Sequence, residues 1–416
     1  MALYPAVKVS DPLGTVRVFD HLNRLAPEAI LRLMSQYRAD CSSDKVDLGI
    51  GVYRDSSGHT PVLDCVGRAE HRLLAAQSTK TYVGALGREE FNRHVEVLVL
   101  GAEHGARSAQ RIRTIQTPGG CGALRLGAEL IKAATPAAKV LVGNPTWGNH
   151  VPLLGASGLT LVHYAYYDPT THELLFDQML ERLEQAASGD VVLLHACCHN
   201  PSGVDPSPVQ WRALIDCLLR RRLVPLVDLA YQGLGDDLLA DVASTRLIFQ
   251  ELPEALLAVS FSKNLGLYRE RAGALIVLSE SVDHAEAVQS HTMQIARGIY
   301  SMPPDHGAAI VATILSDTEL AHAWTQELIP MRERIVAMRA MLAEHLRDAT
   351  GTQMFDFVRT QRGMFSLLGI AMDVVDRLRE QRHIYMTPDG RINLAGINPD
   401  NVAYVSKSIA RELRAR

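Results

Sequence analysis

The chain has 416 residues, and its 42 lysines and arginines are nearly balanced by 46 aspartates and glutamates, giving a formal charge of −4. This balance gives no reason to expect a nucleic-acid-binding protein, which usually carries a basic face. Hydrophobic residues make up 47% of the chain and charged residues 21%. Such a composition is typical of a globular protein with a sizeable core and excludes general disorder.

The sequence contains no membrane or secretory signal. No run approaches the roughly 20 apolar residues of a membrane-spanning helix. The start of the chain, MALYPAVKVSDPLG, lacks the charged and apolar regions of a signal peptide. Six cysteines are too few for a disulfide scaffold. These features predict a cytoplasmic protein of about two or three domains.

Short apolar segments typical of β-strands alternate with longer helical segments in the middle of the chain. The predicted strands are residues 113–116, 139–142, 159–163, 191–195, 224–228, 256–261 and 274–278, and the predicted helices include residues 123–134 and 209–221. Most of the strands are continuous apolar runs, as expected for a sheet buried on both faces. The predicted fold class is therefore α/β, with a large, doubly wound, mostly parallel sheet.

One long helical segment, residues 319–346, follows the strands, and its Pro330 predicts a kink or a break. The rest of the chain mixes short strands with a final helix over residues 401–413. We predict a large α/β domain at residues 62–330. A smaller α/β domain is expected to combine both chain ends, residues 1–61 with an N-terminal arm and residues 331–416.

The first candidate site is the segment TPGGCGA, residues 117–123, which joins a predicted strand to a helix. Glycines at the start of a helix leave backbone N–H groups free to bind an anion such as phosphate. A plain tight turn is the alternative. The spacing of the glycines matches neither a dinucleotide-binding fingerprint nor a P-loop.

The second candidate is the segment SFSKNLG, residues 260–266, which directly follows an apolar strand. A lysine with a lowered pKa, such as Lys263 in this position, can form a Schiff base. An ordinary surface lysine is the alternative. Ser260 and Lys263 also match the Ser-x-x-Lys pattern of penicillin-binding enzymes, but the accompanying Ser-Asp-Asn and Lys-Thr-Gly motifs are absent from the sequence.

Two further segments continue predicted strands. Asp228 ends a buried strand in PLVDLAY, residues 225–231, where ligands bind in open α/β sheets; a helix N-cap is the alternative. The segment HACCHNPSG, residues 195–203, allows a zinc interpretation. Because side chains alternate along a strand, they cannot all converge on one ion. The alternative is that Cys197 and Cys198 are buried apolar residues.

Three more residues carry weaker signals. Trp147 lies in a predicted loop, PTWGNH, and is either a stacking partner for a planar ring or a core aromatic. Arg297 and Arg391 lie beside apolar residues and either bind carboxylates through a bidentate fork or form structural ion pairs. Together, the candidates suit pyridoxal phosphate, which needs a lysine for its aldehyde, a carboxylate for its ring nitrogen and donors for its phosphate.

In these motifs the chain closely resembles the class I, fold-type I aminotransferases, in the branch of aspartate and aromatic-amino-acid aminotransferases. The resemblance runs from about residue 12 to residue 412. Its most specific stretches are residues 48–53, 117–125, 197–203, 228–233, 260–273, 300–307 and 390–396.

The resemblance implies that Lys263 holds pyridoxal 5′-phosphate through a Schiff base and moves a proton between the substrate Cα and the cofactor. Asp228 corresponds to the partner of the protonated pyridine nitrogen. His150 and His195 correspond to residues that support this aspartate. The other implied cofactor contacts are Trp147 against the ring, Asn200 and Tyr231 at the ring oxygen, and Gly120, Cys121, Ser260 and Arg271 around the phosphate.

The resemblance also implies a homodimer with shared active sites. Tyr82 would reach the phosphate of the partner subunit, and Arg297 would bind the distal carboxylate of a substrate held there. Arg391 corresponds to the residue that binds the substrate α-carboxylate, and Gly51 lies beside that carboxylate. Trp147 and Asn200 are expected to contact the substrate as well as the cofactor.

Three positions depart from the family pattern. Cys121 stands where Thr or Ser is usual, and a thiol is a poorer hydrogen-bond donor. Ile299 and Met302 replace polar neighbours of the distal-carboxylate arginine. Apolar neighbours favour movement of that arginine away from an aromatic side chain, so aromatic or dual specificity is expected. Ordinary aspartate specificity is the alternative.

The expected reaction is transamination between an L-amino acid, aromatic or aspartate, and 2-oxoglutarate in two half-reactions. Two alternatives stay open at this point. The same cofactor site can run another reaction at Cα or Cβ, such as β-elimination or decarboxylation, because fold alone does not fix chemistry. The chain can also be a non-catalytic ligand-binding relative, although such a protein need not retain both Lys263 and Asp228.

Overall fold

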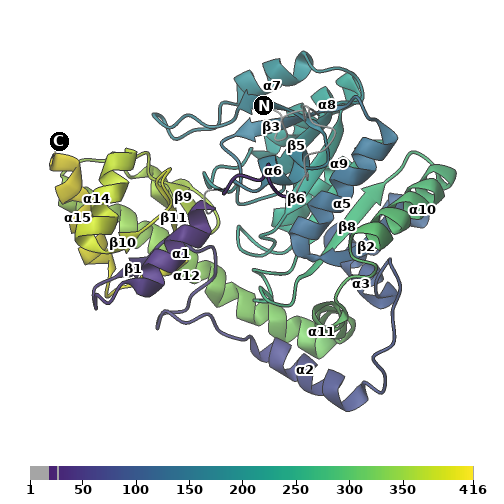
Figure 1. Ribbon diagram of the computed structural model, residues 1–416, viewed down its shortest axis with the longest axis horizontal. Helices are drawn as coiled ribbons and strands as arrows, with labels where there is room; N and C mark the ends of the chain where they lie inside the picture. Colours follow the sequence, from purple (N-terminus) through teal and green to yellow (C-terminus); the bar gives the residue numbers. More distant parts are fainter. Residues whose placement is uncertain (1–17, 26–27, 416) are drawn as a thin grey trace.

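The central feature of the molecule is one large β-sheet (Figure 1). The computed structural model describes residues 18–25 and 28–415, so residues 1–17 of the predicted N-terminal arm lie outside the described residues. Within the described part, seven strands form this sheet in the order β2-β8-β7-β6-β5-β3-β4. The strands are β2 (Ile112–Pro118), β3 (Lys139–Asn144), β4 (Thr160–Ala165), β5 (Val191–His195), β6 (Val224–Leu229), β7 (Ala255–Ser260) and β8 (Ala272–Leu278).

All the strands predicted from the sequence take part in this sheet. β8 runs antiparallel to its neighbours β2 and β7, and the remaining neighbouring pairs are parallel. Every residue of β5, β7 and β8 is buried, which explains why their sequences are continuous apolar runs. The prediction of an α/β fold with a large, mostly parallel sheet is confirmed.

Helices cover both faces of the sheet and enclose two apolar cores (Figure 1). On one face, α5 contacts β2, β7 and β8 and packs against α10; on the other face, α3 contacts β2, α9 and α11. The helices around the sheet are α2 (Asp64–Ala76), α3 (Glu89–Leu100), α4 (Gly105–Ser108), α5 (Gly119–Ala134), α6 (His150–Gly155), α7 (Phe176–Glu184), α8 (Pro208–Arg221), the 3-10 helix η1 (Ala240–Val242), α9 (Ala243–Glu251), α10 (Val282–Ile299) and α11 (Asp305–Ser316).

A segment near the start of the described chain, with α1 and β1, lies beside the C-terminal segment on the left of Figure 1. β1 (Val46–Asp47) pairs in parallel with β10 (Ile384–Tyr385), and β9 (Phe365–Leu367) pairs with the antiparallel β11 (Arg391–Asn393). The accompanying helices are α1 (Ala29–Ala39), α12 (Thr318–Thr350), α13 (Phe357–Thr360), α14 (Met372–Arg382), the 3-10 helix η2 (Leu394–Gly396) and α15 (Val402–Arg414).

The long helix α12 connects these chain ends to the large sheet and contains Pro330 without interruption. Of the predicted kink or break at Pro330, the break is therefore wrong. A proline removes one backbone hydrogen bond, but Leu328 and Met331 on either side of it are buried, so tertiary packing keeps the helix continuous. None of the helices in the described part of the chain combines the length and apolar character needed to cross a bilayer.

Candidate active site

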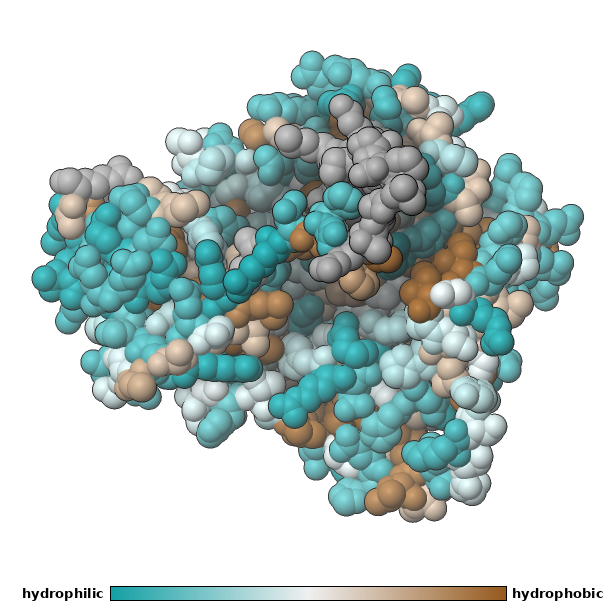
Figure 2. Space-filling model, viewed as in Figure 1, coloured by the Kyte–Doolittle hydropathy of each residue, from teal (hydrophilic) through white to brown (hydrophobic). Residues whose placement is uncertain are grey.

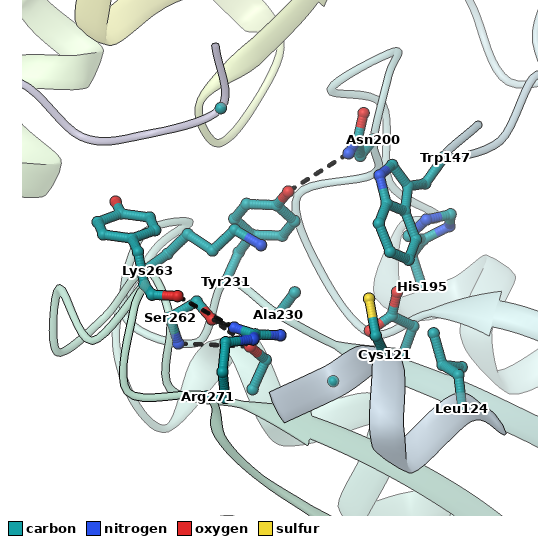
Figure 3. A pocket seen from close by; sticks show the side chains of 15 residues that line it. Cys121, Leu124, Trp147, His195, Asn200, Ala230, Tyr231, Ser262, Lys263 and Arg271 are labelled. Atoms are coloured by element: carbon teal, nitrogen blue, oxygen red, sulfur yellow. Dashed lines mark hydrogen bonds between the residues drawn. The ribbon is translucent and has the colours of Figure 1, made fainter. Parts of the chain in front are cut away.

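A cavity of about 220 Å³ opens at the carboxyl ends of β5, β6 and β7. Ten of the residues singled out in the sequence as cofactor or substrate contacts line it: Gly51, Gly120, Cys121, Trp147, Asn200, Asp228, Tyr231, Ser260, Lys263 and Arg271. Figure 3 shows Lys263 and Ser262 on one side of this cavity and Trp147 and Cys121 on the other. Segments that are far apart in the sequence thus form one site, as the strand-end argument predicts.

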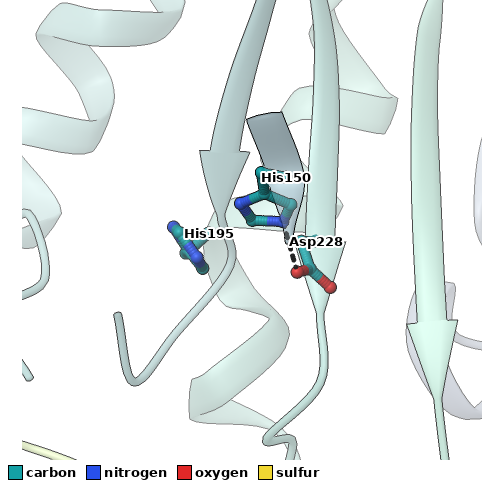
Figure 4. Close-up of side chains that lie close together, drawn as sticks. All are labelled: His150, His195 and Asp228. Atoms are coloured by element: carbon teal, nitrogen blue, oxygen red, sulfur yellow. Dashed lines mark hydrogen bonds and ion pairs between the residues drawn. The ribbon is translucent and has the colours of Figure 1, made fainter. Parts of the chain in front are cut away.

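Sheet register places Asp228 beside its histidines. His195 at the end of β5 lies directly opposite Asp228 in β6. His150, at the start of α6, reaches the same carboxylate, with 3.0 Å between its Nε2 and Asp228 Oδ2 (Figure 4). The other ring nitrogen of His150 lies 2.8 Å from Thr146 Oγ1. Two hydrogen bonds therefore fix the His150 ring, and the ring in turn orients Asp228.

The electrostatics of this cluster favour an ionised aspartate. Burial by itself raises the pKa of Asp228, but the hydrogen bond from His150 and the nearby Lys263 ammonium bring it below its ordinary value. Burial lowers the pKa of His195 to about 3, so this imidazole is neutral at neutral pH. The cavity floor consequently offers one carboxylate that remains charged near neutrality, suited to hold a protonated heterocyclic nitrogen.

Lys263 lies in the turn that follows β7, and its partly buried side chain lines the cavity. The turn is held in place because the indole of buried Trp324 donates a 2.8 Å hydrogen bond to Asn264 O. The Lys263 ammonium lies 5.0 Å from the centre of the Tyr231 ring. Burial lowers the pKa of Lys263, while the Asp228 carboxylate opposes this shift. A larger neutral fraction makes this amine a better nucleophile and base.

An anion cradle forms where α5 begins. Arg271 donates to Ser262 Oγ at 3.1 Å and to Pro118 O at 3.5 Å, which brings its guanidinium over the helix N-terminus. A Cβ at Gly119 would lie 2.3 Å from Arg271 Nη2, and the φ of Gly119 is +69°. Only glycine permits this close approach. Helix dipole, free N–H groups and guanidinium all favour a bound phosphate.

A second cationic group borders the cavity on the side of the chain ends. Arg391 is buried and donates to Gly49 O at 2.9 Å and to Asn200 Oδ1 at 3.3 Å. Its guanidinium carbon lies 4.5 Å from the centre of the Phe365 ring. Within the described residues its Nε has no hydrogen-bond partner. A buried guanidinium with a free donor is prepared to bind a carboxylate.

Asn200 is held in place by the loop around it. The Asp205 carboxylate accepts hydrogen bonds from the backbone N–H groups of Cys198 and His199, at 2.7 and 2.8 Å. The amide of Asn200 then donates to the Tyr231 hydroxyl at 3.4 Å. Asn200 therefore connects Arg391, on the side of the chain ends, with Tyr231 on the side of the sheet.

Comparison with known proteins identifies the family of this site. Residues 43–409 match the family described as Aminotransferase class I and II.

The chain belongs to this family.

Among its relatives, the aromatic-amino-acid aminotransferase of Paracoccus denitrificans is 43% identical over 389 residues, which are 94% of this chain and 98% of the relative. The aspartate aminotransferase of Haemophilus influenzae is 41% identical over 396 residues, 95% of this chain and 100% of the relative. The solved structure of an aromatic-amino-acid aminotransferase from Burkholderia pseudomallei, covalently bound to pyridoxal phosphate, has a TM-score of 0.93 and 41% identity, and the match covers 96% of this chain and 100% of that one.

Three predicted site residues of this aminotransferase are not among the residues that line the cavity. Arg391 contacts the lining residue Asn200, whereas Tyr82 and Arg297 lie at the surface. Tyr82 is 85% exposed, and Arg297, on the last turn of α10, is exposed as well. Both were assigned to the active site of a partner subunit, and their exposure leaves them free to extend from the surface.

Four residues that line the cavity had no predicted role: the apolar Leu124 and Ala230, and the polar Ser262 and Tyr268. Ser262 receives the hydrogen bond from Arg271, and Tyr268 lines the cavity while its hydroxyl accepts a 2.7 Å hydrogen bond from Tyr53 N. Ser262 follows Ser260 by two residues, so the strand-end pattern around Lys263 carried a signal for it.

Among the described residues, the side chains of the segment 195–199 form no converging group of metal ligands. Both cysteines of that segment are buried. The potential ligand atoms that lie within 4.8 Å of one another belong instead to His150, His195 and Asp228. In that group the Asp228 carboxylate is already hydrogen-bonded to His150.

Proposed function

We propose that this aminotransferase uses pyridoxal 5′-phosphate to move an amino group between an L-amino acid, aromatic or aspartate, and a 2-oxo acid, with 2-oxoglutarate as acceptor. The observation that carries the proposal is the placement of Lys263, Asp228 and the glycine cradle around one cavity. The relatives named as aromatic-amino-acid and aspartate aminotransferases support the substrate class.

The residues fit this cofactor. Lys263 supplies a partly buried amine with a lowered pKa for the aldehyde, and Asp228 supplies an ionised carboxylate for the ring nitrogen. Gly120, Cys121, Ser260 and Arg271 line the part of the cavity that suits the phosphate. At Cys121 the thiol sulfur already lies 3.8 Å from Asn149 Nδ2, so the backbone N–H groups of α5 are expected to provide most of the phosphate contacts there.

When bound, the cofactor supplies an electron-deficient ring that accepts the electron pair left as the Cα–H bond breaks. Lys263 then acts as the base that takes the Cα proton and as the acid that returns it. Asp228 keeps the ring nitrogen protonated. Trp147 would lie against the ring, and Asn200 and Tyr231 would hold its oxygen.

Substrate recognition rests on two arginines. Arg391 binds the α-carboxylate, next to Gly51, whose loop is fixed because Asn393 Nδ2 donates to Ile50 O and Val52 O at 2.7 Å. Arg297 of the partner subunit binds a distal carboxylate. Ile299 is 49% exposed beside it, and neither Ile299 nor Met302 offers a hydrogen bond to hold the guanidinium. This favours a site that accepts aromatic substrates as well as aspartate.

The functional unit is a homodimer with shared active sites, located in the cytoplasm. Exposed apolar side chains support the dimer: Leu74 of α2 is 81% exposed and Val62 is 75% exposed. Figure 2 shows brown, apolar side chains at the lower edge of the molecule, where Figure 1 places α2. All six cysteines are free thiols, in keeping with a reducing compartment. A large domain at residues 62–330 and a small domain from both chain ends would close on substrate and exclude water.

The variant Lys263→Ala tests the proposal. It removes the proton-transfer group, so turnover of aspartate and phenylalanine should be lost while thermal unfolding stays that of a folded protein. Substantial transamination by the variant without added amine would contradict the role of Lys263. Product analysis separates the alternatives. Release of ammonia or carbon dioxide by the wild type would indicate elimination or decarboxylation, and binding without any product would indicate a non-catalytic relative.

A further inference from the structure

The two residues assigned to the partner subunit lie on separate segments of the chain. Tyr82 belongs to the loop between α2 and α3, and Arg297 to the last turn of α10. A groove of about 540 Å³ lies between the segments, lined by residues 76–81 and Val83 from the first and by Met302, Asp305 and His306 from the second. The two walls of the groove must keep a fixed spacing if Tyr82 and Arg297 are both to reach the active site of the partner subunit.

An ion pair joins the two segments directly. Arg88, the residue before α3, donates from Nε to Asp305 Oδ1 at 3.0 Å and from Nη2 to Asp305 Oδ2 at 2.8 Å. Asp305 is the first residue of α11, directly after the turn that carries Met302. The pair is bidentate and partly buried, with the side chains 29% and 21% exposed. Such geometry fixes orientation as well as distance.

Gln116, in β2, connects the same two segments through hydrogen bonds. Its side chain is fully buried; its Oε1 accepts from Arg88 N at 2.8 Å, and its Nε2 donates to Pro304 O at 2.8 Å. A Cβ at Gly87 would lie 2.3 Å from Gln116 Cβ, and the φ of Gly87 is +78°. Glycine at this position therefore permits the loop to touch β2.

Only a short stretch of chain joins these contacts to Tyr82 and to Arg297, the two residues assigned to the partner's site. Six positions separate Tyr82 from Arg88, and eight separate Arg297 from Asp305. On the second side the path is further restricted, because Ser301 N and Tyr300 N both donate to Ala296 O, at 3.2 and 3.0 Å, and Ala296 is fully buried. A displacement at Arg88 or Asp305 therefore also displaces the side chains of Tyr82 and Arg297.

We propose that Arg88, through Asp305 and Gln116, is a positioning residue that acts in trans: it sets the spacing at which one subunit presents Tyr82 and Arg297 to the active site of its partner. This inference rests on the proposed function, because it needs a shared site. It adds a clip, formed by Arg88, Asp305 and Gln116, whose loss damages the partner's site and leaves the site of its own chain intact.

Two heterodimers with the same set of substitutions test this, purified from differently tagged chains that carry bound cofactor. In the separated form, one chain carries Arg88→Asp and the other Lys263→Ala. Its single site with Lys263 receives Tyr82 and Arg297 from a chain with an intact clip. In the combined form, one chain carries both substitutions and the other is wild type, so the single site with Lys263 receives both residues from the damaged clip.

The separated form should retain about half of the wild-type activity per dimer, since one of its two sites is complete. The combined form should lose on the order of 100-fold in kcat/KM for aspartate, the loss typical of a displacement of about 1 Å in a catalytic constellation. It should also release the cofactor more readily in dialysis, because Tyr82 no longer reaches the phosphate. The opposite order of activities, or equal activities, would overturn the proposal.

Homodimers provide the controls. Arg88→Asp combined with Asp305→Arg restores the pair in reverse and should recover most of the activity that Arg88→Asp loses. Arg212→Asp breaks a comparable pair with Glu251, between α8 and α9, and should leave activity unchanged. Failure of the reversed pair to recover activity would contradict the clip. A wild-type dimer that does not transaminate would overturn the proposed function itself, and the inference with it.

Discussion

Replacing Arg391 with lysine should lower kcat/KM for every amino acid substrate, whatever its side chain. The lysine keeps the charge but loses the planar fork that the buried guanidinium offers. Arg391 donates to Gly49 O and Asn200 Oδ1, and its Nε has no partner among the residues that the structure describes. One hydrogen bond to a charged group contributes ~1.5–3 kcal/mol. Loss of one such bond to the α-carboxylate corresponds to a decrease of about ten- to 150-fold.

The assay is steady-state transamination with aspartate and with phenylalanine, each with 2-oxoglutarate. Both amino acids carry the same α-carboxylate, so both should lose activity to a similar degree. Arg297→Lys is the matched comparison, since it replaces an exposed arginine that faces only a distal carboxylate, and should affect aspartate alone. A loss confined to aspartate in Arg391→Lys, or no loss, would refute the assignment of Arg391 to the α-carboxylate.

Two further predictions concern the cofactor. His150→Phe removes the hydrogen bond that lowers the pKa of Asp228 and leaves its burial uncompensated, so Asp228 becomes protonated at higher pH. The acid limb of the kcat/KM profile should move to higher pH, and an unchanged or lower limb would count against this role. Gly119→Ala places a Cβ against Arg271 and should weaken cofactor binding about tenfold or more, measured by titration of the apoprotein. Gly58→Ala, at a similar positive φ but with nothing within 4 Å, should bind the cofactor normally.

The sheet could be predicted from the sequence because burial on both faces leaves a clear pattern. β5, β7 and β8 are buried at every residue, so each appears as an apolar run that ends in a polar residue or turn. The two-residue strands β1 and β10 are too short to show any periodicity. Their pairing depends on contacts between residues 46–47 and 384–385, which no local pattern encodes.

At Pro330, the tertiary packing of α12 outweighs the low helix propensity of proline. The proline signal was read correctly as a defect in helical hydrogen bonding, but α12 buries residues on both sides of it, from Leu320 to Leu346. Summed over such a length, apolar burial outweighs the ~3 kcal/mol that an internal proline costs.

The part of the candidate site that lies at the carboxyl ends of the strands could be predicted from the sequence. Asp228 and Ser260 lie at the carboxyl ends of β6 and β7, and Lys263 and Asn200 follow β7 and β5, so parallel register alone brings them to one edge of the sheet. Other contacts depend on side chains that the pattern does not distinguish. In the sequence, Tyr268 is not distinguishable from any other loop tyrosine, and Arg88 and Asp305 are not distinguishable from other surface charges. Their contacts, Tyr268 with Tyr53 and Arg88 with Asp305, become visible only in the fold.

The central claim is that Lys263 and the surrounding cavity carry out transamination through a bound pyridoxal phosphate. The most direct measurement is the visible absorbance of the purified protein, titrated separately with aspartate and phenylalanine at matched concentrations. Each amino acid should convert the cofactor to its amine form and remove the band, and 2-oxoglutarate should restore it. Conversion by aspartate alone would contradict the dual specificity, and a band that neither amino acid changes would contradict the central claim.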